Sequence, residues 1–234
     1  MPVKPMYLKI TKAFLLIFFG VLNLSLHAQL TKSTIKQLNI NSSSKDSVNE
    51  STLSGCINNW LYLNGTKSSV TIGDLDITGN EVTIEALFNR TIPYTTPNEI
   101  YAGDIVSKHL DPKDVNYLLR PNTAEITTTD GYFRTPDICD IDLNKTYHVA
   151  LVYNGKKLKF YRNGFLMSET PCTGNMITND WPTTFGTTAY PPNNLPVDFT
   201  GFINEVRIWN KARSQNQIKQ YANSSLPNPT TQNG

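Results

Sequence analysis

Residues 143–164 read LNKTYHVALVYNGKKLKFYRNG, and this stretch decides the fold. An apolar run at 147–153 ends at Asn154-Gly155, and a second run at 158–161 ends at Asn163-Gly164. Asn-Gly is the dipeptide of tight hairpin turns, because both residues tolerate positive φ. Two such turns about nine residues apart predict three consecutive antiparallel strands, the third at 165–167.

The rest of the chain shows the same strand-and-turn pattern. Val82, Ile84, Ala86 and Phe88 recur at period two, which is typical of a strand with one buried face. Shorter apolar runs predict further strands at 60–63, 70–72, 105–106, 117–119, 126–128 and 203–209. One short helix is expected near the end, capped by Ser214 with Ile218 and Tyr221 on its inner side. Many strands and one late helix predict an all-β chain of two packed antiparallel sheets.

The N-terminus has the pattern of an export signal. Lys4, Lys9 and Lys12 precede the apolar stretch 13–26, and Ala28 offers a small residue for cleavage. We expect a signal peptide at 1–28; an N-terminal membrane anchor is the alternative. Residues 29–55 are polar and Ser/Asn-rich, which predicts a flexible leader. One domain is then expected at 56–226, followed by a disordered tail at 227–234, with no membrane span in the mature chain.

Charge excludes one class of partner. The whole chain carries 21 Lys+Arg and 19 Asp+Glu. Removal of residues 1–28 leaves 18 basic against 19 acidic residues, a net charge of −1. A nearly neutral surface gives no electrostatic reason to bind nucleic acid or an anionic membrane.

Three cysteines, Cys56, Cys139 and Cys172, follow the expected export site. Export permits a disulfide, and the favoured pair is Cys139–Cys172, which flanks the predicted hairpin. The odd count leaves a free thiol or an intermolecular bridge, and other connectivities stay open.

Three segments together resemble a known family. VTIEALFNR (82–90), the stretch 143–164 and GFINEVRIWNKARSQNQI (201–218) are similar to the laminin-G-like (concanavalin A-like lectin/glucanase) jelly rolls, and the resemblance covers about 57–225. It implies a two-sheet antiparallel jelly-roll β-sandwich. It also implies a secreted or cell-surface protein of the bacterial envelope or extracellular space.

The chain departs from this family at two places. Asn204 stands where relatives commonly have an Asp that helps to hold a structural calcium. A neutral amide oxygen is a weaker calcium donor than a carboxylate, so a calcium site is not expected here; the alternative is one at Asn204, completed by carbonyls near Asn64 and Gly65. Relatives also continue into another strand after the helix. Here either the strand at 60–63 fills that place, or the chain is a fragment of a longer protein.

The sequence lacks the residues that glycoside hydrolysis would require. Hydrolase relatives carry Glu-x-Asp-x-x-Glu on one strand, a pattern absent from this sequence, and glycoside hydrolysis needs a carboxylate pair. Glu85 and Glu205 are better interpreted as ion-pair formers, with Arg207 as a partner. For His148, the resemblance implies packing and hydrogen bonding. The acidic segment 137–142 is interpreted as a solvated connector, with a metal loop as the alternative.

Sugar recognition needs exposed aromatic rings and planar polar side chains. Asn116 and Arg120 share a strand face by the period-two rule, and Tyr132 follows the Asp130-Gly131 turn. The candidate ligand-binding residues are Asn116, Arg120, Tyr132, Arg134 and Trp181, with Tyr94, Tyr101 and Tyr190 as further aromatics. We therefore predict a non-catalytic binding or adhesion module that recognises a glycan or an extracellular protein. The alternatives are a glycosidase-like enzyme and a structural spacer of a larger surface protein.

Overall fold

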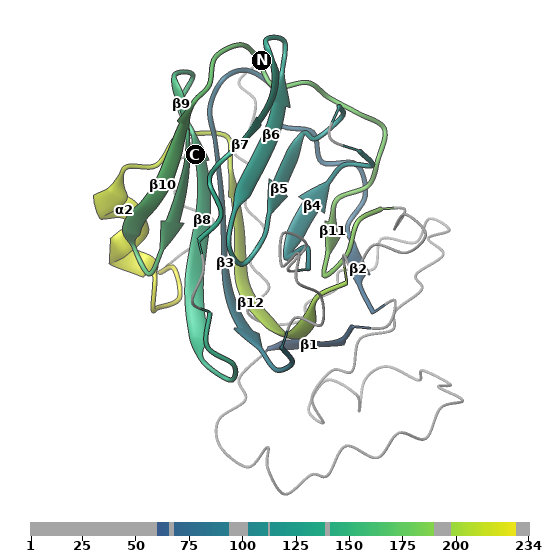
Figure 1. Cartoon of the computed structure of the whole chain (residues 1–234), viewed down its shortest axis with the longest axis vertical. Helices are drawn as coiled ribbons and strands as arrows, with labels where there is room; N and C mark the ends of the chain where they lie inside the picture. The colour runs from purple at the N-terminus through teal and green to yellow at the C-terminus, as the bar shows by residue number, and fades with distance from the viewer. Residues whose placement is uncertain are drawn as a thin grey trace, which may run out of the picture.

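The computed structural model describes residues 60–65, 68–93, 103–111, 113–138, 141–189 and 198–227. These residues form two antiparallel six-stranded sheets and one short helix (Figure 1). The first sheet has the order β1 (Leu61–Asn64), β12 (Thr200–Trp209), β3 (Val82–Arg90), β8 (Thr146–Tyr153), β9 (Lys157–Arg162), β10 (Phe165–Pro171). The second has the order β2 (Val70–Thr71), β11 (Thr184–Phe185), β4 (Val106–Lys108), β5 (Tyr117–Leu119), β6 (Ala124–Thr128), β7 (Gly131–Arg134). The predicted two-sheet jelly-roll sandwich is confirmed.

The two Asn-Gly turns join β8, β9 and β10 as expected. Asn163 and Gly164 both have positive φ, 51° and 79°, as a tight hairpin turn requires. At the first turn only Gly155 is positive, and the side chain of Asn154 accepts the backbone N–H of Lys157 at 2.9 Å instead. Both turns therefore reverse the chain, although by different local geometries.

The alternating residues of β3 enter the core between the sheets. Val82, Ile84, Ala86 and Phe88 are fully buried there. Thr83 and Glu85, on the opposite face of β3, are also buried, so this strand has two buried faces rather than one. The reason is that the segment after β12 crosses the outer side of this strand, where Thr83 Oγ1 donates to the carbonyl of Lys211 at 2.7 Å and accepts the N–H of Arg213 at 2.9 Å. Helix α2 (Gln215–Tyr221) follows, and its Ile218 packs on Ala150, Val152 and Tyr161 of the neighbouring strands.

Glu85 is the centre of a buried polar cluster under α2. Its carboxylate lies 3.0 Å from His148 Nε2 and accepts Trp209 Nε1–H at 2.8 Å. Arg207 contacts Glu85 at 3.5 Å and Glu205 at 3.2 Å, which confirms the predicted ion pairs. Burial alone would raise the pKa of Glu85, but the His148 hydrogen bond and the neighbouring positive charges lower it below the usual value.

The C-terminal end is held by this cluster and by helix capping. Ser214 and Gln217 form a reciprocal capping box at the start of α2, as the predicted cap requires. Arg207 donates to the carbonyls of Tyr221 at 3.0 Å and Ser224 at 2.6 Å. At the sheet edge, β1 pairs with β12, so the strand near residue 60 occupies that place. Within the described part of the chain, no helix has the length and apolarity that a membrane span requires.

Candidate functional site on the second sheet

The outer face of the second sheet carries a row of polar side chains from β6 and β7. Ile126 and Phe133 contact the core, so strand alternation turns Glu125, Tyr132 and Arg134 to the opposite face. Antiparallel pairing then sets Glu125 directly across from Arg134. The register of one hairpin therefore creates this row.

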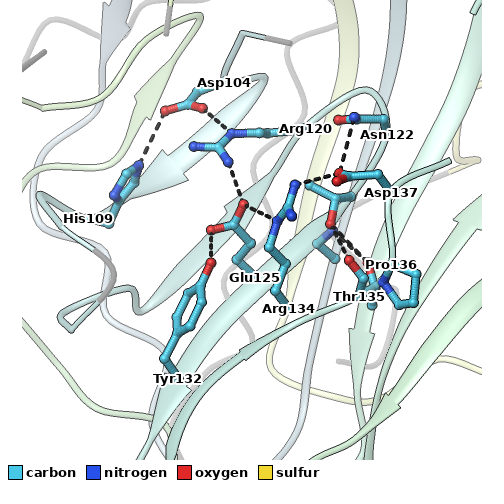
Figure 2. A network of polar contacts seen from close by, with 12 residues as sticks. Asp104, His109, Arg120, Asn122, Glu125, Tyr132, Arg134, Thr135, Pro136 and Asp137 are labelled. Carbon is cyan, nitrogen blue, oxygen red and sulfur yellow. Dashed lines mark hydrogen bonds and ion pairs between the residues drawn. The ribbon is translucent and has the colours of Figure 1, made fainter. Parts of the chain in front are cut away.

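Glu125 is the hub of the row (Figure 2). One carboxylate oxygen, Oε1, accepts from Arg120 Nη1 at 2.5 Å and from Arg134 Nε at 3.2 Å. The other, Oε2, accepts the hydroxyl proton of Tyr132 at 2.5 Å. Glu125 is almost completely buried beneath these groups, and it therefore orients all three of them.

The network extends in both directions from Glu125. On one side Arg120 Nε donates to Asp104 Oδ1 at 2.8 Å, and Asp104 Oδ2 lies 3.2 Å from His109 Nε2. On the other side Arg134 Nη2 donates to Asp137 Oδ1 at 2.5 Å, which also accepts from Asn122 Nδ2 at 3.2 Å. Figure 2 shows these groups as one continuous chain of contacts, here called the Glu125 network.

Burial and the charges of the network shift the pKa values of Asp104, Arg120 and Tyr132. Burial alone raises the pKa of Asp104, but the Arg120 charge and the His109 hydrogen bond lower it below the usual value. Burial lowers the pKa of Arg120, but Asp104 and Glu125 raise it by more. Burial and the Glu125 carboxylate both raise the pKa of Tyr132, so its hydroxyl stays a hydrogen-bond donor at neutral pH.

Only one end of the Glu125 network reaches solvent. Tyr132 is 40% exposed, and the side chains of Arg134 and Asp137 are 25% and 30% exposed. Asp104 is fully buried, and Arg120 and Glu125 nearly so. A ligand can therefore contact the Tyr132–Arg134–Asp137 end, while the buried end supports it.

A family model confirms the type of fold that carries this surface. The laminin G-type model of the concanavalin A-like lectin/glucanases superfamily matches residues 64–219. The chain belongs to this superfamily. No curated protein matches the sequence.

Solved structures with the same fold come from several sources. Domain 4 of the extracellular arabinanase AbnA of Geobacillus stearothermophilus, solved with arabinotriose, has a TM-score of 0.56 and 19% sequence identity. The alignment covers 72% of this chain and 78% of that chain. A putative carbohydrate-binding protein of Bacteroides ovatus has a TM-score of 0.50 and 21% sequence identity, and the alignment covers 70% of this chain and 45% of that chain. The binding domain of Paraclostridial Mosquitocidal Protein 1 has a TM-score of 0.51 and 15% sequence identity, and the alignment covers 69% of this chain and 42% of that chain. At these identities the likeness shows the fold.

The structure brings together three of the five predicted ligand-binding residues. Arg120, Tyr132 and Arg134 all belong to the Glu125 network of this lectin/glucanase-type domain. Asn116 does not join them at an exposed surface. It is fully buried, where its amide bonds the backbone N–H and carbonyl of Ile77, both at 2.9 Å, and the carbonyl of Ile177. Asn116 is thus a structural bridge between two loops.

Trp181 belongs to a different cluster. Its indole Nε1–H donates to Asp114 at 2.8 Å, and its carbonyl accepts from Lys108 Nζ at 2.6 Å. The side chain is half-buried. Trp181 therefore orders the loops around Lys108 and takes no part in the Glu125 network.

The predicted calcium ligands do not converge. Asn64 pairs with Thr200 across the sheet, so Asn204 lies four residues farther along β12, about 13 Å away. The amide oxygen of Asn204 accepts the N–H of Glu205 at 2.8 Å, and that of Asn64 accepts the Ser68 hydroxyl. Gly65 packs against Thr200. These residues do not fit one calcium coordination sphere, and within the described ranges no group of three or more His, Cys, Asp or Glu is placed to hold a metal.

Of the cysteines and the remaining aromatic candidates, the structure describes Cys172. Cys172 carries a free, buried thiol, so the predicted Cys139–Cys172 disulfide is not shown. Cys56 and Cys139 lie outside the described residues, as do Tyr94, Tyr101 and Tyr190.

Sequence reasoning did not assign Asp104, Glu125 or Asp137 to the site, and it interpreted the segment that begins at Asp137 as a solvated connector. Glu125 carried a usable signal, because it lies between Ala124 and Ile126, which alternation sends into the core. Asp104 carried none, since its pairing with Arg120 depends on the register of β4 against β5, in which Val106 lies opposite Leu119.

Proposed function

We propose that this chain is an exported, non-catalytic carbohydrate-binding module whose ligand docks on the outer face of the second sheet. One observation carries the proposal: the exposed Tyr132 ring is held by Glu125 beside the half-exposed Arg134–Asp137 pair. An aromatic face packs on the apolar side of a sugar ring, and fixed planar polar groups bond its hydroxyls.

The geometry suits a ligand of sugar size. Tyr132 and Arg134 are two residues apart on β7, on one face, about 7 Å along the strand. A sugar stacked on Tyr132 would thus bring its hydroxyls toward Arg134 and Asp137. The fold agrees with this role, since similar domains include one solved with arabinotriose and one described as a putative carbohydrate-binding protein.

The proposal that the module is non-catalytic rests on the ion pairs of the carboxylates in the Glu125 network and on the pKa of Asp104. Asp104, Glu125 and Asp137 each contact a guanidinium group. A glycosidase needs a general acid with a raised pKa, whereas the pKa of Asp104 is lowered. We therefore expect no release of reducing ends from any glycan that binds.

A glycan-array screen of the purified chain tests the proposal, followed by titration calorimetry with the best hit. We expect Tyr132→Ala to weaken binding by at least about tenfold, because the stacking surface is lost. Tyr132→Phe keeps the ring and should retain most of the affinity. Phe165→Ala is the matched control, since Phe165 is 52% exposed but lies on β10 of the other sheet.

Two outcomes would overturn this proposal. A blank array with folded protein would favour a protein partner or a spacer role. Equal losses in Tyr132→Ala and Phe165→Ala would move the site away from β7. Export is tested separately by mass spectrometry of the chain expressed with its own N-terminus, where we expect a mature protein beginning at Gln29.

A further inference from the structure

Resting on the proposed function, we infer that the glycan recognised at the Glu125 network is uncharged, and that the site discriminates against uronic acids and sulfated sugars. Two observations support this inference. Carboxylates outnumber guanidinium groups in the site, and the guanidinium groups already contact carboxylates of the protein.

The site has no surplus positive charge. The Glu125 network contains three carboxylates, Asp104, Glu125 and Asp137, and two guanidinium groups, Arg120 and Arg134. Two further titratable groups contact acids of the network: the Tyr132 hydroxyl contacts Glu125, and His109 contacts Asp104 at the buried end. The carboxylates of the network outnumber its guanidinium groups, so the site offers an anionic ligand no net attraction and places carboxylates beside it.

The guanidinium groups are committed to the protein's own acids. Arg120 contacts Asp104 and Glu125, and Arg134 contacts Glu125 and Asp137. A sugar carboxylate would have to compete with these pairs for the in-plane N–H groups of a guanidinium, which bind an anion in bidentate fashion. It would also lie against Asp137 and meet a like charge.

A hydroxyl group avoids both penalties. It donates to a carboxylate and accepts from a guanidinium, and the exposed Arg134–Asp137 pair offers both partners side by side. Among the described residues, Asp137 Oδ1 accepts from Arg134 and Asn122, while no hydrogen bond is found for its Oδ2. Vicinal hydroxyls of a neutral sugar therefore match this end of the network, whereas a charged substituent does not.

The test compares matched pairs of oligosaccharides that differ only in charge, such as a neutral oligosaccharide and its uronic acid or sulfated analogue. We expect the neutral member to bind at least about tenfold more tightly at neutral pH, because like charges in a site repel strongly. Its affinity should change little between low and physiological salt, since ion pairing contributes nothing to it.

The variant Asp137→Asn removes one negative charge and keeps the shape of the side chain. We expect it to reduce the preference for the neutral member, chiefly by improving binding of the charged analogue. The matched control is Asp142→Asn, an exposed acid outside the network, which should leave the preference unchanged. Tighter binding of the charged analogue, or equal binding of both, would overturn the inference while leaving carbohydrate binding intact. Binding of neither would overturn the proposed function itself.

Discussion

Lys108 and Asp74 form an ion pair in which the ammonium group is completely buried. The Nζ atom lies 2.5 Å from Asp74 Oδ1 and 3.1 Å from Asp76 Oδ1. It also donates to the carbonyl of Asn179 at 2.8 Å, to its amide oxygen at 3.1 Å, and to the carbonyl of Trp181 at 2.6 Å. One side chain from β4 thus ties together two loops that are about a hundred residues apart in sequence.

Replacement of Lys108 by methionine should destabilise the domain by about 3 kcal/mol, near the low end for a broken buried ion pair, because Asp74 remains half-exposed and can be solvated. The measurement is the free energy of unfolding from urea titration. Lys113→Met, at an exposed position, is the control and should cost less than about 0.5 kcal/mol. Equal effects of the two variants would show that the Lys108 contacts contribute little.

Acid sensitivity should begin only below about pH 5. Both Glu85 and Asp104 have folded-state pKa values below their usual ones. Their contribution to stability is therefore fully present above the unfolded-state pKa values, about 4.3 and 3.9, and is lost as pH falls through the folded-state values. The urea midpoint should be nearly flat from pH 7 to about pH 5 and then decrease.

Matched variants assign this acid transition. Asp104→Asn and Glu85→Gln should each lower the stability at neutral pH, because positive partners lose a buried carboxylate. Each should also show a shallower decrease below about pH 4. An unchanged slope in both variants would assign the acid transition to other groups.

Gly201 should not tolerate a side chain. Its φ is 141°, and an added Cβ would lie 2.1 Å from the backbone oxygen of Asn89 on the paired strand β3. Gly201→Ala should therefore cost about 3 kcal/mol or more, measured by urea unfolding. Gly79→Ala is the control: its φ of 86° is also positive, but its Cβ would meet no atom within 4 Å, so about 1 kcal/mol is expected.

The thiol of Cys172 should be unreactive in the folded protein. Burial is the main reason that its pKa rises to about 12, and its side chain is nearly inaccessible. Alkylation by iodoacetamide at pH 8, followed by peptide mapping, should be at least about a hundredfold slower than in urea. A Cys139–Cys172 cross-linked peptide in the unreduced map would instead support the predicted disulfide.

Much of the fold could be predicted because its signals are local. The turn at Asn163-Gly164, the alternation in β3 and the cap at Ser214 each depend on residues close in sequence. The strands β7 and β11 were missed. Thr184–Phe185 is too short to show a period, and Gly131–Arg134 carries only Phe133 as an inward apolar residue.

The candidate site was predicted in part for the same reason. Tyr132 and Arg134 follow a recognisable turn, and alternation sets them on one face. Asn116 was expected at a ligand-binding surface but is fully buried, because the loops that bury it come from residues near 77 and 177. Burial by distant segments leaves no trace in the local pattern.

The sequence by itself therefore determined most of the strands, the Asn-Gly turns and the family of this chain, since backbone preferences and side-chain alternation act over a few residues. Only the tertiary structure decided which charges meet. Glu125 joins Arg120 to Arg134 through strand register, and Lys108 finds Asp74 through loop packing. Such contacts depend on three-dimensional proximity, so they appear only when both sheets and their loops are assembled.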